Sequence, residues 1–368
     1  MKALLSALIF IHGIVHLTGF MKAFKLADVR KLPFDISKTA GSFWLLTAVL
    51  FMVSSGLLLF NSRIWWIPLP AAIIVSQLLI AVRWSEVKFG TVANAALLIP
   101  LVLAVIGTLP SSPNGRYRAE VMEKLSPLPQ AEVVGPESVS RLPLPVRRYL
   151  AYVGVIGKPA VTNFRAVFDG VVRKERNGNW IETSSSQYDF LDEPARFVYS
   201  RSSVLGVPVY GFIRYSREGV GSDVKIANIV SIADGRGSDV WKDEALIMFT
   251  DICSMAPSML IDSSVKWEGI DSLTAKAEFS CRGETVSAVL HFNRKGELVN
   301  FLSKDRSFSP DGKSFVHCPW SMSFSDYGKF DGKLVAKRTD AIWHTPAGEF
   351  KYEKASLREI EYDCSRFK

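Results

Sequence analysis

The sequence predicts a membrane anchor of four transmembrane helices followed by an α+β domain. In that domain a curved antiparallel sheet or half-barrel carries inserted helices on its concave face. Two observations predict this division of the 368 residues: the first 110 contain four long apolar stretches, and the remainder alternates like β-strands and holds all four cysteines. The expected domains are residues 1–110 for the helices, 111–140 for a linker and 141–368 for the sheet.

Each apolar stretch is long enough to cross a bilayer as a helix, because about 20 apolar residues span the ~30 Å hydrocarbon core. The last three stretches contain no charged residue, and a helix satisfies its own backbone hydrogen bonds inside lipid. The expected spans are Ala3–Met21, Thr39–Phe60, Ile64–Val82 and Thr91–Leu109.

Basic residues predict the orientation of these spans. The first and third loops hold seven Lys or Arg, against two in the second loop and the N-terminal tip. By the positive-inside rule, the first and third loops are cytoplasmic. The expected location is therefore the cytoplasmic membrane, as a multi-pass protein whose C-terminal domain is extracytoplasmic. The sheet domain carries little of the net charge of +8, which argues against a nucleic-acid partner.

His12 and His16 are four residues apart and share one face of the first span. Intramembrane ionisable groups are often functional, so a metal or haem-iron site is one interpretation. The favoured interpretation is polar packing inside the bundle, because no other His, Cys, Asp or Glu occurs within a span. No metal or cofactor is therefore expected.

The second half begins with a proline-rich linker and an amphipathic helix from Pro145 to Gly154. From Phe164 onward the period is two, and turn pairs such as Asn177-Gly178 separate the runs, which predicts antiparallel strands. One segment, Trp241–Ile261, has helical spacing, and Pro257 begins a second short helix within it. Helices inserted here would cover the concave face of the sheet and line an apolar cavity. Strands are expected near 164–170, 179–190, 195–202, 207–216, 220–232, 273–281, 284–293, 297–304, 315–325, 333–343 and 348–362.

The even number of cysteines permits disulfides, and all three pairings of the four stay open. No Cys-x-x-Cys pair, phosphate-binding glycine loop, nucleophile elbow or His-Glu-x-x-His occurs in the sequence. His317 and Cys318 are neighbours, but adjacent strand residues face opposite ways, so they do not form a catalytic pair. No catalytic residue is therefore assigned.

The candidate ligand-binding residues lie where strands meet helices. Asp305 and Arg306 follow the run Leu298–Ser303, and arginine suits bidentate recognition of a carboxylate or phosphate. A structural ion pair between the two is the favoured alternative. Asp251 and Asp262 are expected to cap or orient helices. The aromatic candidates are Trp241, Trp267, Trp320 and Phe249, which are expected mainly in the core.

Several segments resemble a bacterial family of membrane-anchored proteins of unknown function. They are Trp267–Asp271, Phe292–Phe301, Ser303–Arg306, Gly348–Tyr352, Thr250–Asp262 and His12–Phe20. The order of strands and inserted helices is more distantly similar to the periplasmic lipoprotein-carrier (Lol-type) superfamily. That resemblance implies a half-barrel that binds acyl chains and is closed by helices.

The expected function is therefore an extracytoplasmic domain that binds a lipid or other apolar ligand in a half-barrel cavity, with Arg306 meeting the head group. Burial would supply about 0.8 kcal/mol per CH₂ group. One alternative is an envelope enzyme that uses carboxylates such as Asp251 or Asp305 on lipid or cell-wall substrates. Another is a sensor or assembly scaffold, which would carry an exposed apolar patch. Binding is favoured over catalysis, and both the ligand and any protein partner stay open.

Overall fold

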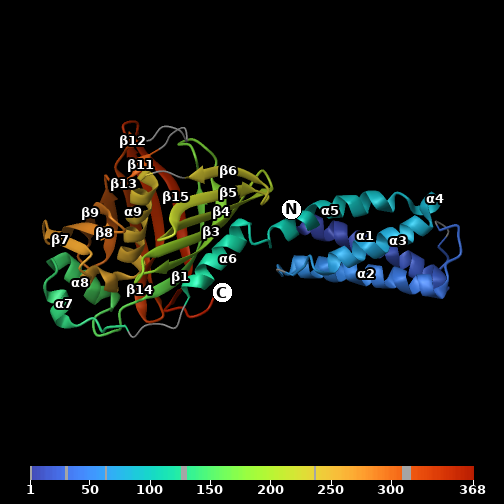
Figure 1. Cartoon of the computed structure of the whole chain (residues 1–368), viewed down its shortest axis with the longest axis horizontal. Helices are drawn as coiled ribbons and strands as arrows, with labels where there is room; N and C mark the ends of the chain where they lie inside the picture. The colour runs from blue at the N-terminus through green and yellow to red at the C-terminus, as the bar shows by residue number, and fades with distance from the viewer. Residues whose placement is uncertain (1, 30–31, 63, 126–130, 236–237, 309–315) are drawn as a thin grey trace. The chain divides into compact units, whose positions relative to one another are not determined.

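The computed structural model divides the chain into two units, Met1–Leu109 and Pro110–Lys368 (Figure 1). It describes residues 2–29, 32–62, 64–125, 131–235, 238–308 and 316–368. For residues 233–235 and 238–239 only the backbone is described. Residues 126–130 of the expected linker lie outside this part. The first unit is helical and the second is built on one large sheet, and each is described by itself.

The helical unit begins with two long helices, α1 (Lys2–Ala23) and α2 (Lys38–Leu59). Ser37 caps α2, because its hydroxyl accepts a hydrogen bond from the backbone N–H of Ala40 at 3.2 Å. The remaining helices of this unit are α3 (Pro68–Val82), α4 (Trp84–Val87) and α5 (Gly90–Ile106).

Two helices of this unit, not four, are long and apolar enough to cross a bilayer. The helices α1 and α2 have 22 residues each, whereas α3 and α5 have 15 and 17. At 1.5 Å per residue the shorter pair falls below the ~30 Å hydrocarbon thickness. The prediction of four transmembrane helices is therefore wrong in number. One reason is that proline favours the first turn of a helix, so α3 starts at Pro68 and the apolar residues 64–67 precede it.

The second unit is a 13-stranded antiparallel sheet with the strand order β6-β5-β4-β3-β2-β1-β15-β14-β13-β10-β9-β8-β7. The sheet is open, with β6 and β7 at its edges. The strands that come first and last along the chain, β1 and β15, pair with each other at the centre of the sheet. Phe164 of β1 lies opposite Tyr362 of β15. The strands are β1 (Asn163–Val172), β2 (Ile181–Phe190), β3 (Ala195–Val204), β4 (Val207–Ser216), β5 (Gly219–Ile226), β6 (Val230–Gly235), β7 (Val265–Gly269), β8 (Thr274–Cys281), β9 (Glu284–Phe292), β10 (Leu298–Ser303), β13 (Trp320–Phe330), β14 (Lys333–Thr345) and β15 (Gly348–Tyr362), with β11 (Ser307–Phe308) and β12 (Val316–His317) as a separate two-stranded pair.

The expected strands are present with three differences. The run at 220–232 is two strands, because the backbone turns at Ala227 and Asn228, both with positive φ. The run at 315–325 is divided by Cys318 and Pro319 into β12 and β13. The short strands β7 and β11 have no counterpart among the expected strands.

Helices cover both faces of the sheet. The inner face carries α8 (Leu144–Val153), α9 (Ser238–Met255) and the 3₁₀ helix η1 (Pro257–Ile261), as Figure 1 shows for α8 and α9. The outer face carries α6 (Pro113–Lys124), which packs on β3 and β4 and was expected to be part of a linker. The short helix α7 (Pro136–Ser140) precedes α8.

The main core fills the space between the inner helices and the sheet. Phe249 of α9, Phe301 of β10 and Trp320 of β13 are all 0% exposed, and their rings contact one another in series. Large side chains therefore occupy the part of the concave face where an apolar cavity was expected. This packing orients α9 on the sheet.

The packing of α1 on α2 can be tested at Gly19. A Cβ at this position would clash with the ring of Trp44, whereas a Cβ at Gly56 would meet nothing within 4 Å. We expect Gly19→Ala to lower the melting temperature of the full chain in detergent micelles. The measurement is thermal unfolding monitored by circular dichroism. Gly56→Ala is the matched control and should melt at the wild-type temperature or above, because alanine favours helix by about 1 kcal/mol over glycine. Equal melting of the two variants would contradict the packing of α1 on α2.

Candidate functional site

A buried polar cluster lies between α9 and strands β2 and β3. The carboxylate of Asp251 accepts hydrogen bonds from Arg196 Nε at 2.8 Å and from Gln187 Nε2 at 3.1 Å. Arg196 also pairs with Glu244, two helical turns before Asp251, at 3.1 Å. Because Gln187 and Asp189 are two residues apart on β2, both point to this inner face. The cluster therefore joins one helix to two strands through charged contacts.

Asp189 is the most deeply buried member of this cluster. It is 0% exposed, it accepts a hydrogen bond from Gln187 Nε2 at 3.3 Å, and its Oδ2 atom has no hydrogen-bond partner within the described residues. Burial, followed by the charge of Asp251, raises the pKa of Asp189 well above its usual value. Asp189 is therefore easier to protonate here than in water, and it lies beside the ion pair of Asp251 with Arg196.

Arg306 lies in an aromatic enclosure further along the inner face. Its Nη1 donates to the hydroxyl of Tyr352 at 2.8 Å, and its guanidinium carbon lies 4.6 Å from the ring centroid of Trp320 and 5.1 Å from that of Trp343. Its buried Nε has no hydrogen-bond partner among the described residues. A β-bulge in β15 turns both Tyr352 and Glu353 toward this face. Arg306 thus keeps donors that no carboxylate of the described chain engages.

Asp305 does not pair with Arg306, contrary to one of the sequence-based interpretations. It accepts from Lys242 Nζ at 2.8 Å and from the backbone N–H and hydroxyl of Ser287 at 2.7 and 2.8 Å. Burial raises the pKa of Asp305, but the bonds from Lys242 and Ser287 outweigh it and hold the pKa below its usual value. Asp305 and Arg306 therefore bind different partners, although they are adjacent in the sequence.

The remaining candidates are dispersed. Trp320 and Phe249 belong to the ring series that leads to Arg306. Trp241 packs edge-on against Tyr215 at 5.7 Å between ring centroids. Trp267 lies apart, where its Nε1 donates to the carbonyl of Leu260 at 3.0 Å and ties η1 to β7.

The two histidines of α1 face the interior of the helical unit. His12 Nε2 lies 3.0 Å from Asn94 Oδ1 of α5, and His16 Nε2 lies 3.0 Å from Ser76 Oγ of α3. No group of three or more His, Cys, Asp or Glu in the described ranges is arranged to hold a metal ion.

An apolar pocket of about 520 Å³ opens where β11 and β12 meet the ends of β13 and β14. Phe308 links it to the arginine enclosure, because its ring lies 5.1 Å from that of Trp343. The Cys318 thiol donates to the carbonyl of His344 at 3.2 Å, and burial raises its pKa, so it is not an activated nucleophile. The four cysteines are all free and buried. The pocket is lined by Phe308, Val316, His317, Cys318, Pro319, His344, Thr345 and Pro346.

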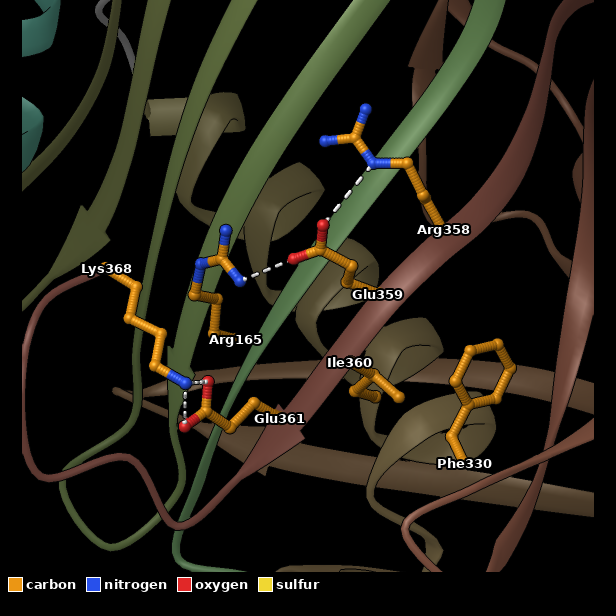
Figure 2. Close-up of a pocket in the computed structure, with 7 residues that line it drawn as sticks. All are labelled: Arg165, Phe330, Arg358, Glu359, Ile360, Glu361 and Lys368. Carbon is orange, nitrogen blue, oxygen red and sulfur yellow. Dashed lines mark hydrogen bonds and ion pairs between the residues drawn. The ribbon is translucent and has the colours of Figure 1, made fainter.

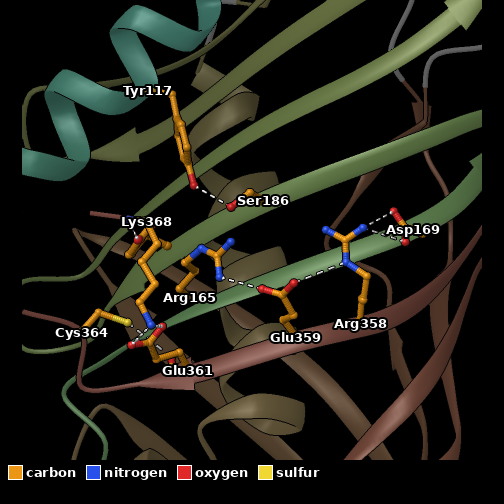
Figure 3. A network of polar contacts seen from close by, with 10 residues as sticks. Tyr117, Arg165, Asp169, Ser186, Arg358, Glu359, Glu361, Cys364 and Lys368 are labelled. Carbon is orange, nitrogen blue, oxygen red and sulfur yellow. Dashed lines mark hydrogen bonds and ion pairs between the residues drawn. The ribbon is translucent and has the colours of Figure 1, made fainter. Parts of the chain in front are cut away.

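A second depression, of about 420 Å³, lies over β1 and β15 and is mostly charged (Figure 2). Its charges neutralise one another: Arg165 pairs with Glu359 at 3.1 Å, and Lys368 pairs with Glu361 at 2.6 Å. Figure 3 shows these contacts beside the hydrogen bond between Tyr117 of α6 and Ser186, 3.0 Å long. Because Glu359 and Glu361 alternate with the core residue Ile360, this network lies on the outer face. It is a solvated ion-pair surface rather than the better ligand site.

Sequence reasoning missed Arg196, Asp189 and the lining of the apolar pocket. The available signal was the pair Gln187 and Asp189, which share one face of β2 while the aromatic Tyr188 and Phe190 share the other. That pattern marks a polar inner stripe, but it does not identify the helix that covers it.

The comparisons with known proteins concern mainly the sheet unit. Residues 132–355 match the family of unknown function DUF6544. A search of curated proteins found no match.

Three solved structures show a distant likeness. A DUF1329 family protein from Desulfovibrio piger is 13% identical over 64% of this chain and 95% of its own, with a TM-score of 0.35. A putative outer membrane lipoprotein-sorting protein domain from Vibrio parahaemolyticus is 8% identical over 56% and 87%, with a TM-score of 0.31. A LolA superfamily protein from Nitrosomonas europaea is 10% identical over 64% and 94%, with a TM-score of 0.22. These scores are too low to assign a function.

We expect Asp251→Asn to destabilise the sheet unit by about 1.5–3 kcal/mol, because it removes one charge-assisted hydrogen bond of the buried Arg196 and leaves Glu244 as its remaining carboxylate partner. The measurement is the urea midpoint of the full chain by pulse proteolysis. Glu359→Gln is the control, because it breaks an exposed pair that contributes about 0–1 kcal/mol. An Asp251→Asn midpoint equal to the control would show that this contact does not hold α9 on the sheet.

Asp189→Asn should act in the opposite direction and depend on pH. A raised pKa in the folded state means that folding favours the protonated acid, so the wild type loses stability as pH rises above the usual value of 3.8. Asparagine keeps the shape without this loss. We therefore expect Asp189→Asn to raise the urea midpoint at pH 7, with the gain shrinking as the pH approaches 4. A gain that grows toward pH 4 would reverse the assigned sign.

Proposed function

The chain belongs to the family of unknown function DUF6544, and we propose that its sheet unit binds a lipid or another apolar ligand in the pocket beside β11 and β12. The observation that carries the proposal is the pocket itself. Its volume of about 520 Å³ falls in the ~300–1,000 Å³ range of small-ligand sites. Phe308, Val316, Pro319 and Pro346 contribute apolar walls.

Binding would act by removing apolar surface from water. Val316 is 57% exposed, so a ligand that covers it gains from burial of both surfaces. Each CH₂ group of an acyl chain contributes about 0.8 kcal/mol when buried. A short acyl segment therefore suffices for measurable affinity.

Arg306 supports a ligand with an acidic head group. The arginine lies over the ring of Trp343, which in turn contacts Phe308. Among the described residues its side chain donates one hydrogen bond, to the neutral Tyr352 hydroxyl. Guanidinium groups bind carboxylates and phosphates through two parallel hydrogen bonds. Rotation of Phe308, which belongs to the two-residue strand β11, would expose the arginine to a head group held in the pocket.

The helical unit supplies the membrane attachment in this proposal. The 22-residue helices α1 and α2 are long enough to cross a bilayer. Five Lys or Arg lie in or beside the loop between them, which favours a cytoplasmic loop and an extracytoplasmic sheet unit. The ligand would then be held beside the membrane instead of being carried away from it.

An acid–base enzyme is a second candidate, and one observation favours it. Asp189 has a raised pKa and lies beside the Asp251–Arg196 pair, and such perturbed groups occur at catalytic sites. However, neither of the two pockets described above is lined by these residues. Binding is therefore the better supported function.

Photo-crosslinking of the full chain in nanodiscs tests the binding proposal. The probe is a diazirine fatty acid, and mass spectrometry maps the labelled peptides. We expect labelling at 316–319 and 344–346 that an unlabelled fatty acid competes away and that Val316→Asp reduces several-fold.

Ile270→Asp is the matched control, because Ile270 is 54% exposed, close to the 57% of Val316, but lies outside the pocket. It should leave the labelling unchanged. Labelling confined to residues 1–109, or equal in the two variants, would overturn the pocket assignment.

A further inference from the structure

Two neighbouring hairpin turns of the sheet unit expose apolar side chains to solvent. Leu205, at the tip of the β3–β4 turn, is 100% exposed, and Ile229, in the β5–β6 turn, is 57% exposed. These turns hold six of the eleven exposed large apolar side chains in the described part of Pro110–Lys368, so the exposure is concentrated rather than scattered. The six are Val204, Leu205, Val207, Ile229, Val230 and Ile232.

The two turns form one continuous patch. Strands β3, β4, β5 and β6 are consecutive neighbours in the sheet, and both turns lie at the same end of these strands. The backbone N–H of Ala227, in the second turn, donates to the carbonyl of Pro208, just after the first, at 2.8 Å. Figure 1 shows these strand ends beside one another.

The backbone conformation at Leu205 is a second reason why a leucine is unexpected at this exposed position. Val204 pairs with Val207, so Leu205 and Gly206 form a two-residue turn, and their φ angles are 50° and 82°. Two positive φ angles define the turn type that favours Asn, Asp or Gly at its first position. A leucine there is disfavoured both by the backbone and by hydration. An apolar surrounding would offset both costs.

The patch lies close to the point where the chain enters this unit from the apolar helices. Lys225, which precedes the second turn by two residues, donates through Nζ to the carbonyl of Ser111 at 3.2 Å. Ser111 is the second residue after Leu109, the last residue of the helical unit. The second turn is therefore tied to the first residues of the sheet unit.

The charges around the patch suit a phospholipid surface. Arg201 of β3 lies opposite Tyr210 of β4, and both lie within a few residues of the first turn. Lys225 and Arg116 share one acidic partner, Asp223, at 3.4 and 3.2 Å, which leaves an excess of positive charge. Basic residues near an anionic membrane surface each contribute attraction, and tyrosine favours the interface.

We propose that the β3–β4 and β5–β6 turns insert into the interfacial region of the membrane that carries the helical unit. Leu205 and Ile229 enter the apolar boundary, while Arg201 and Lys225 meet lipid phosphates. This contact rests on the membrane attachment proposed above, but it does not depend on the ligand pocket. It gives the sheet unit a second point of attachment to that membrane.

Depth-dependent fluorescence quenching tests the insertion. Single cysteines replace Leu205 or Ile229 in the full chain, carry the fluorophore NBD, and are reconstituted in vesicles that contain doxyl-labelled phosphatidylcholine and anionic phosphatidylglycerol. We expect a blue-shifted emission at both positions and quenching by shallow doxyl groups. The wild-type chain, whose four cysteines are buried, controls for background labelling.

Two further positions separate the possible outcomes. NBD at Val49 of α2, 46% exposed, reports the membrane attachment, and NBD at Ile270 reports solvent. Quenching at Val49 with solvent-like emission at Leu205 and Ile229 would overturn the insertion and leave the attachment intact. Solvent-like emission at Val49 would overturn the attachment itself. A blue shift without doxyl quenching would indicate contact with another protein copy and would also overturn the proposal.

Leu205→Asn provides a test that does not perturb folding. Asparagine suits the positive φ of the turn, so the urea midpoint should stay equal or rise. Quenching of NBD at Ile229 should fall by a factor of two or more, because one apolar anchor is lost. Unchanged quenching in this variant would show that Leu205 takes no part in the contact.

Discussion

The arrangement of the sheet unit depends on one topological constraint: the chain must pass from one edge of an open sheet to the other. Strand β6 lies at one edge and β7, its next strand in the chain, at the opposite edge. The segment between them therefore has to cross a face of the sheet. It does so as α9 and η1. The helix α9 contacts β4 and β5 near one edge, β14 near the centre and β9 near the other edge. A crossing helix buries one apolar side and creates the inner core, because the backbone groups within a helix are already satisfied.

The polar cluster at Asp251 follows from the same crossing. Apolar packing alone tolerates sliding of a helix over a sheet, whereas the contacts of Asp251 with Arg196 and Gln187 define one position. A buried charge network contributes little net stability, because desolvation opposes the Coulomb attraction. Its worth here is positional: it fixes where α9 lies on β2 and β3. The Asp189 Oδ2 atom, which has no hydrogen-bond partner in the described part of the chain, is the energetic cost that remains in this arrangement.

The local features of the fold were accessible from the sequence, and the non-local ones were not. The period of two predicted most strands, and Pro145 and Gly154 predicted α8, since these signals lie within a few residues of what they specify. The pairing of β1 with β15 carries no such signal, because the two strands lie almost 200 residues apart. The same reason explains Asp305, whose partner Lys242 lies 63 residues away and not next to it. The lengths of α3 and α5 were overestimated. Hydropathy shows how long an apolar stretch is, but it does not show that a helix begins at a proline or ends in a turn within that stretch.

The register of the sheet connects the pocket with the exposed turns. Thr345 of β14 pairs with Gly348 of β15, Val172 of β1 pairs with both Glu353 and Ile181, and Thr183 of β2 pairs with Ser202 near the Leu205 turn. The pocket and the turns therefore lie at the same end of the strands. Five strand spacings separate β14 from β4, about 24 Å at 4.8 Å per strand. Because neighbouring strands are rotated by about 20° relative to one another, five spacings turn these two strand ends away from a common direction. Figure 1 shows β11 and β12 at the top of the sheet unit and the ends of β5 and β6 at its side. The pocket and the turns are therefore separate sites.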